Sequence, residues 1–297
     1  MKQKPRYITL PETWDELTQD DWREILRMRQ TVATTDHVWT IRDVRIQTAC
    51  TLLKNRGVKM QVNNKQYLVL LSLLADTLDW LWKEDNGTLS LVYRSTLNLL
   101  PGIGKNGKKD GKSVYKWIGP LSHGSDLTFG EFRQALTVLK NYETRMSVRD
   151  LDVLAGLLYR PEATEQQRHE QQLRRIPYDW DTFGQKEIRG QKMERWQVWG
   201  IYAWFAYFCE YLTTGTFLID GSEVTFAPLF AGDDTEDVSC DSSGNSMLRI
   251  CLTLAESQVF GTAHDVDHTP LLTVMLKLLQ DYETLMRLKK TYNKKTK

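Results

Sequence analysis

Cysteine is scarce in this chain of 297 residues, and its four copies are scattered. Cys50, Cys209, Cys240 and Cys251 form no C-x-x-C pair. A zinc ribbon needs such pairs, and small secreted domains need cysteines in a dense framework of disulfides. The spacing therefore argues against both kinds of fold, and the sequence predicts no metal site and no cofactor.

A surplus of charge of either sign is also missing. The 39 basic and 38 acidic side chains leave a net charge of +1, so no overall field attracts nucleic acid or an anionic membrane. The most apolar run, residues 198–212, is shorter than the ~20 residues that span a bilayer, and it contains Glu210. The first seven residues lack the apolar stretch of a signal peptide. We therefore expect a protein of the cytoplasm with no membrane partner.

Catalytic motifs are absent as well. The sequence has no G-x-S-x-G elbow, no H-E-x-x-H pair and no protein-kinase string. Gly102 to Gly107 fits the G-x-G-x-x-G pattern, but the Lys-Lys-Asp-Gly that follows is a poor start for the helix that a dinucleotide site needs. His264 and His268 have ligand-like spacing, yet a proline soon follows, so we interpret them as part of a helix connection with Asp267 or Thr269 as the next N-cap. We expect no enzymatic activity and no catalytic residues.

The clearest local signals are two copies of the pattern Leu-Thr-x-x-acid-aromatic-Arg, at residues 17–23 and 127–133. In each copy the Thr side chain can accept a hydrogen bond from an amide of the first helical turn. The acid three residues later can accept one from the Thr amide, and the Leu can pack on the aromatic ring. Both copies therefore predict a helix start, capped by Thr18 or Thr128. The residues after each copy differ, so we interpret them as independent caps.

Apolar residues recur at helical spacing over most of the chain, which predicts a mainly α-helical protein. Pro101 to Pro120 interrupts this pattern with five glycines and five lysines and predicts a flexible connecting loop, while Gly215 to Gly244 predicts an irregular acidic loop. We expect an N-terminal helical module at 1–100, the connecting loop at 101–120, and a main helical domain with a basic tail at 121–297. Helices are expected at 18–32, 38–53, 67–82, 129–142, 147–158, 166–175, 196–212, 247–259 and 270–290. Asp85-Asn86-Gly87 is expected to close the helix at 67–82.

Two groups of side chains are candidate binding residues. The lysines of the connecting loop are possible phosphate contacts: Lys105, Lys108, Lys109 and Lys112. The second group lies on the most aromatic helix and includes pairs at same-face spacing: Trp196, Trp199, Trp204 and Phe208. Such a stripe is typical of a core, and it is also typical of a protein-binding surface, where aromatic anchors dominate the energy.

Three strings carry a resemblance to a known group of proteins. They are Ile8 to Thr18 (ITLPETWDELT), Leu151 to Pro161 (LDVLAGLLYRP) and Leu254 to Gly261 (LAESQVFG). Together they resemble uncharacterised proteins of tailed phages and prophages of Bacteroidetes-type hosts and, more loosely, phage tail assembly chaperones. The resemblance covers about a third of the chain and assigns no functional residue.

The resemblance implies work by protein binding, with a tail or tape-measure protein as the partner. We therefore expect a non-enzymatic assembly factor of a phage or prophage particle, similar to a tail assembly chaperone and acting in the host cytoplasm. The alternative is a nucleic-acid-associated phage or mobile-element protein that uses the lysine-rich loop and the basic tail.

Overall fold

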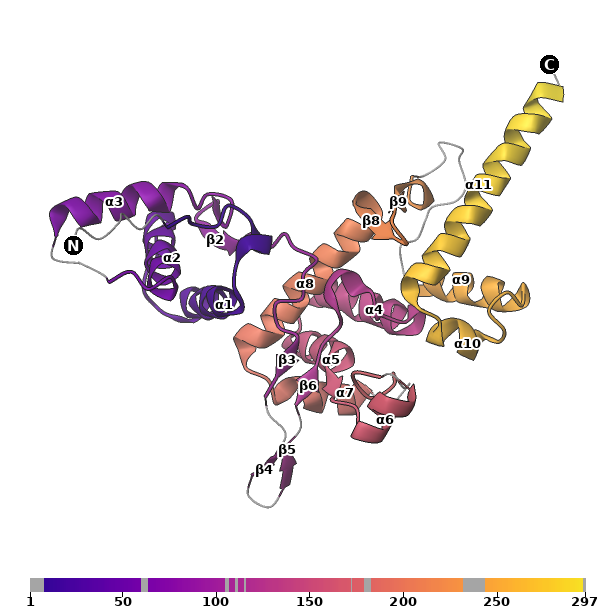
Figure 1. The fold of residues 1–297 in the computed structure, drawn as a ribbon, viewed down its shortest axis with the longest axis horizontal. Coiled ribbons are helices and arrows are strands. Elements are labelled where there is room, and N and C mark those ends of the chain that lie inside the picture. The colour runs from indigo at the N-terminus through magenta and orange to yellow at the C-terminus, as the bar shows by residue number, and fades with distance from the viewer. Residues whose placement is uncertain are drawn as a thin grey trace, which may run out of the picture. The chain divides into compact units, whose positions relative to one another are not determined.

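The computed structural model describes residues 8–59, 64–104, 107–109, 112–114, 116–171, 173–178, 183–231 and 244–295. Within these ranges the chain forms eleven α-helices and nine short strands, so the expectation of a mainly α-helical protein is confirmed (Figure 1). Two compact units are present. The first comprises Met1–Ser95 and Glu194–Gly200, and the second comprises Thr96–Met193 and Ile201–Lys297. Helix α8 (Arg195–Thr214) therefore contributes its first turns to one unit and the rest to the other.

The first unit packs around a cluster of aromatic side chains. The Trp14 ring lies 6.1 Å from the Trp22 ring and 4.7 Å from the Tyr93 ring, and all three side chains are buried. Aromatic pairs at such distances and tilts add to the energy of their burial. The elements around this core are a 3-10 turn (Trp14–Glu16), α1 (Gln19–Thr34), α2 (Ile41–Asn55), α3 (Lys65–Asp76), β1 (Trp82–Asp85) and β2 (Thr88–Leu91).

Helix α1 begins with the predicted capping box. The Thr18 hydroxyl accepts a hydrogen bond from the Asp21 amide at 3.2 Å, and the Asp21 carboxylate accepts one from the Thr18 amide at 3.1 Å. The same buried carboxylate also accepts hydrogen bonds from Asn55 at 2.8 Å and from Arg56 at 3.2 Å. Asp21 therefore joins the start of α1 to the end of α2, in addition to capping its own helix.

The helix expected at 67–82 ends earlier, at Asp76. Strand β1 starts at Trp82 and pairs antiparallel with β2, with Trp82 opposite Leu91 and Asp85 opposite Thr88. The Asn86-Gly87 pair, which was expected to close a helix, is instead the hairpin turn, and both residues have positive φ (49° and 75°). Two left-handed residues match the twist of antiparallel strands, and Asn-Gly adopts this turn readily.

The second unit consists of helices with a few short strand pairs. Asp220-Gly221 forms a second turn with two positive φ angles, and the hairpin that it joins was not expected. The His264–His268 segment is itself a short helix and not a plain connection. The elements are β3 (Gly102–Ile103), β4 (Gly107–Lys109), β5 (Lys112–Val114), β6 (Trp117–Ile118), α4 (Phe129–Arg145), α5 (Val148–Leu158), β7 (Arg160–Pro161), α6 (Glu165–Gln171), α7 (Phe183–Gln191), β8 (Thr216–Ile219), β9 (Ser222–Thr225), α9 (Gly244–Glu256), α10 (Ala263–His268) and α11 (Leu271–Lys295).

Helices α5 and α7 pack closely because each has a glycine at the crossing. A Cβ atom on Gly156 would collide with the carbonyl oxygen of Lys186, and one on Gly190 would collide with that of Asp152. The backbones therefore touch in a way that only glycine allows. This pair was not expected, because the sequence around α7 shows no strong apolar stripe.

The segment 101–120, expected as a flexible connecting loop, contributes strands to the second unit. Strand β6 pairs with β3 and with β7, so that Trp117 lies opposite both Ile103 and Pro161. Ile103, Trp117 and Ile118 are buried. The apolar residues at both ends of the segment anchor it to the core, while its lysine-rich middle forms the β4–β5 hairpin.

Candidate interaction surfaces

Three of the four aromatic side chains of α8 that were candidates for protein binding are buried, and the fourth, Trp199, is half-buried. In the first unit, Trp196 is buried beneath the Arg27 guanidinium at 5.0 Å, and Trp199 is half-buried beneath Arg29 at 4.3 Å. In the second unit, Trp204 and Phe208 are buried and stack with their ring centroids 5.6 Å apart. Burial removes three of these four side chains from contact with a partner. Their spacing reflects packing inside this chain.

The candidate phosphate contacts fall on the β4–β5 hairpin. Lys105 lies outside the described residues, and Lys108, Lys109 and Lys112 are described in their backbone alone. Lys109 pairs with Lys112 across the hairpin. Hairpin pairing brings these two lysines together on adjacent strands, which their sequence positions did not predict.

A basic groove lies beside the strands from which this hairpin projects. Its volume is about 340 Å³, and the charged side chains that line it, counted over the described residues, are Lys116, Arg168, Arg174 and Glu162. Glu162 pairs with Lys116 at 3.4 Å and with Arg168 at 3.6 Å, while Arg174 pairs with Asp126 at 3.2 Å. Two cations share one partner, so positive charge exceeds negative charge in the lining. Such a groove can attract a phosphate group.

Helix α3 in the first unit exposes an apolar stripe. Leu71 and Ala75 are buried against the rest of the unit, where α3 packs beside α2 (Figure 1). On the opposite side, Val69, Leu70 and Leu73 are 61%, 50% and 61% exposed. These three residues, at positions i, i+1 and i+4, share one helix face. We refer to them as the α3 stripe.

The sequence predicted a helix in this region but not the α3 stripe, because periodicity alone does not say which face of an apolar helix is covered. The string KQYLVLLSLLAD is apolar on every side. A helix of that composition needs cover on all faces, and in the part of the chain that the structure describes α3 has cover on one. The signal in the sequence was that the helix is apolar on all sides, although the N-terminal module that contains it is too small to cover every side.

A buried ionic cluster in the second unit was also missed. The Glu131 carboxylate is fully buried and lies 3.1 Å from Arg175 and 3.4 Å from Arg160, two side chains that are themselves 4% and 7% exposed. Arg175 also donates a hydrogen bond to the Leu158 carbonyl at 2.6 Å. Burial lowers the pKa of Arg160 to about 10, against the raising effect of the Glu131 charge. The cluster holds α4 to β7, and its burial denies it to a substrate.

The histidine pair at 264 and 268 shows no surrounding ligand set. The two rings lie 4.1 Å apart, and the His268 Nδ1 is 2.7 Å from the His264 carbonyl oxygen. Thr262 caps this helix, whereas Asp267, expected as an N-cap, forms a buried ion pair with Arg133 at 3.0 Å. Among the described residues, no three His, Cys, Asp or Glu side chains are placed to hold a metal ion.

Comparison with known proteins gives no relative for this chain. No family model, no curated protein and no solved structure matches it. Over the described ranges, no helix has both the length and the apolar content needed to cross a membrane. The surfaces themselves therefore carry the functional argument.

Proposed function

We propose that this chain is a non-enzymatic protein-binding factor that acts in the assembly of a tailed-phage particle or tail, and that the α3 stripe is its binding surface. The observation that carries the proposal is the exposure of Val69, Leu70 and Leu73 by half or more on one face of a helix. Contiguous exposed apolar side chains are typical of interaction sites. The phage setting and the tail or tape-measure partner rest on the sequence resemblance.

The geometry of the stripe favours a partner with an apolar groove. A helix recognised in this way presents anchors one turn apart, as Val69 and Leu73 do at i and i+4. Covering three half-exposed aliphatic side chains would contribute on the order of 3 kcal/mol. That is enough to strengthen an interface about a hundredfold and too little to form one alone.

The test places a photo-crosslinking amino acid at Leu73 in the full-length chain, expressed together with the tail and tape-measure proteins of the same phage or prophage. The matched control places it at Leu288 of α11, which is similarly exposed (64% against 61%). We expect an adduct with a tail component from position 73 and little from position 288. Equal adducts from both positions, or adducts with unrelated host proteins alone, would refute the assignment.

A negative charge introduced on the α3 stripe gives a quantitative test. Because the Leu73 side chain is exposed, Leu73→Glu should leave the fold intact, which circular dichroism can check. We expect it to weaken binding to the captured partner at least tenfold, whereas Leu288→Glu should change it less than twofold. Equal loss in both variants would place the binding surface elsewhere.

The basic groove favours a second candidate function, the binding of single-stranded or double-stranded nucleic acid. Lys116, Arg168 and the lysine hairpin lie in one part of the second unit, and phosphate contacts make affinity depend on salt. Replacing Lys108, Lys109 and Lys112 with Gln should lower the slope of log affinity against log salt by about 2 to 3. Lys192→Gln, an exposed lysine of the same unit, is the control. An unchanged slope would rule out this use of the hairpin.

A further inference from the structure

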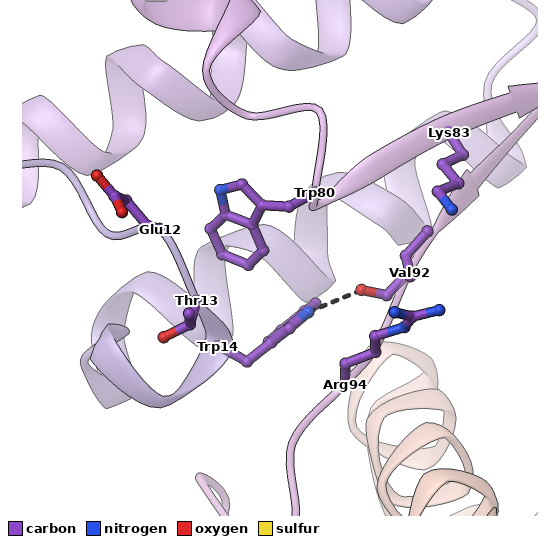
Figure 2. A pocket seen from close by; sticks show the side chains of 7 residues that line it. All are labelled: Glu12, Thr13, Trp14, Trp80, Lys83, Val92 and Arg94. Carbon is purple, nitrogen blue, oxygen red and sulfur yellow. Dashed lines mark hydrogen bonds between the residues drawn. The ribbon is translucent and has the colours of Figure 1, made fainter.

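A pocket of about 250 Å³ lies in the first unit, between the N-terminal segment and the β1–β2 hairpin (Figure 2). Trp14 forms its floor, and its indole N–H is already donated to the Val92 carbonyl at 2.7 Å. Trp80 forms a wall, with its ring nearly perpendicular to that of Trp14 (85°) and the centroids 6.2 Å apart. Trp80 is half-buried, so part of its ring remains open to a ligand.

Two cations lie at one end of this pocket, Lys83 on β1 and Arg94 in the segment that follows β2. Leu91 and Tyr93 are buried, so the alternation of an extended chain turns Val92 and Arg94 to the outer side. Lys83 lies on the neighbouring strand, and Figure 2 shows its ammonium on the same side as the Arg94 guanidinium. Both side chains are exposed, and the described residues offer neither of them an ion pair.

A carboxylate occupies the opposite end. Glu12 lines the pocket from the N-terminal segment, and Figure 2 shows it across the Trp80 ring from the two cations, with its carboxylate turned away from the ring. Its backbone amide donates to Glu16, but its own carboxylate is exposed and has no partner among the described residues. The pocket is therefore polarised. The Glu12 carboxylate lies at one end, the Trp80 ring in the middle, and the cationic side chains of Lys83 and Arg94 at the other end.

We propose that this pocket binds a pyrimidine nucleotide whose base carries an exocyclic amine, that is, a cytidine phosphate. The base would stack on Trp80, as bases do on aromatic side chains. Its amine would donate to the Glu12 carboxylate once that exposed side chain rotates toward the ring, and its phosphate would contact Lys83 and Arg94. A cavity of about 250 Å³ is smaller than the ~300 Å³ at which ligand pockets usually begin, so it suits one ring better than two.

Two features favour a nucleotide over an aromatic amino acid. A phosphate monoester carries a charge of about −1.5 to −2 and so uses both cations, whereas a single carboxylate neutralises one. A cytosine ring brings its own amine to Glu12, whereas a phenyl ring has no donor on its edge. Uracil has the same size as cytosine and a carbonyl in place of the amine, so it isolates the contribution of Glu12.

Calorimetric titration of the full chain with cytidine, uridine and ribose 5-phosphates tests the proposal. We expect cytidine monophosphate to bind about tenfold tighter than uridine monophosphate, and ribose 5-phosphate to bind weakest. Glu12→Gln should remove the preference for cytidine. Lys83→Gln should weaken both nucleotides severalfold, while Lys54→Gln, an exposed lysine of the same unit, should have no effect.

Several results would overturn the proposal. Equal binding of ribose 5-phosphate and cytidine monophosphate would mean that the ring does not enter the pocket. Binding of phenylalanine in the absence of nucleotide binding would identify a different ligand class. If cytidine monophosphate, uridine monophosphate and ribose 5-phosphate all fail to bind at millimolar concentration, the pocket is not a nucleotide site. Thermal unfolding of each variant separates a lost ligand contact from a lost fold.

Discussion

Replacement of Glu131 by Gln should destabilise the second unit by about 3 to 5 kcal/mol, because it leaves two buried guanidinium groups without their shared counter-charge. The structure sets this magnitude. The carboxylate is 0% exposed, and its oxygens lie between 3.1 and 3.5 Å from nitrogens of Arg160 and Arg175. Asp126 is 3.5 Å from Arg175 and remains as a weaker, partly exposed partner. Such a loss would be a large share of the 5 to 15 kcal/mol that usually holds a domain folded.

The matched control is Glu24→Gln in α1, which breaks the ion pair with Arg27. The two side chains of that pair are 49% and 46% exposed, so solvent screens the pair and the expected loss is below about 1 kcal/mol. Hydrogen exchange with mass spectrometry is the assay, because peptides from α4 and from α1 report on the two units separately. Unfolding of the whole chain need not be a single transition.

A third variant tests whether the cluster stabilises the second unit by charge compensation. Replacing Glu131, Arg160 and Arg175 together by apolar residues of similar volume should recover most of the stability, since desolvation offsets much of the attraction within a buried ion pair. If Glu131→Gln costs less than 1 kcal/mol, or if the triple replacement is as unstable as the single one, the cluster does not work by charge compensation.

Three further predictions concern the two units. Trp14→Phe should cost about 1 to 3 kcal/mol because it leaves the Val92 carbonyl without its donor. Trp80→Phe should cost less, because the Trp80 indole N–H has no hydrogen-bond partner among the residues that the structure describes, and urea unfolding compares the two variants. Burial raises the pKa of Asp21, but hydrogen bonds and a nearby arginine outweigh it and hold that pKa below its usual value, so this stabilisation is present above about pH 4 and lost below it. Asp21→Asn should flatten that acid limb in hydrogen exchange. Gly156→Ala should destabilise the second unit by at least 1 to 3 kcal/mol in thermal unfolding, and a neutral result would show that α5 and α7 can separate.

Local signals in the sequence predicted local structure well. Thr18 caps α1 with the full reciprocal box, and Thr128 accepts a hydrogen bond from the Glu131 amide at 3.3 Å as expected. The second half of the Thr128 box was wrong, because the Glu131 carboxylate lies with Arg160 and Arg175. Those arginines come from positions 29 and 44 residues further along the chain. Ion pairs with two arginines that are distant in sequence replace the hydrogen bond from the Thr128 amide to the Glu131 carboxylate. No local sequence pattern predicts these ion pairs.

The turns were misread for a related reason. Asn86-Gly87 follows an apolar helical pattern, so it was interpreted as a helix end, although the same dipeptide is the strongest short hairpin signal. The choice between the two depends on whether the preceding residues find a strand partner. Trp82 does so by pairing with Leu91, and its burial fixes the register of the hairpin.

The same dependence explains why most of the aromatic candidates on α8 are buried, whereas α3 has an exposed apolar face that was not predicted. Both helices are strongly apolar, and periodicity alone assigns neither to a core or to a surface. Trp204 and Phe208 are buried because other elements of the second unit cover them. Val69 and Leu73 remain exposed because α2 covers only the opposite side of α3. A second copy of the chain or a different protein could supply the missing cover. Sedimentation velocity measured over a range of protein concentrations distinguishes self-association from binding to a different protein. Self-association through the α3 stripe would be weakened by Leu73→Glu. It would also compete with the proposed partner for the same surface.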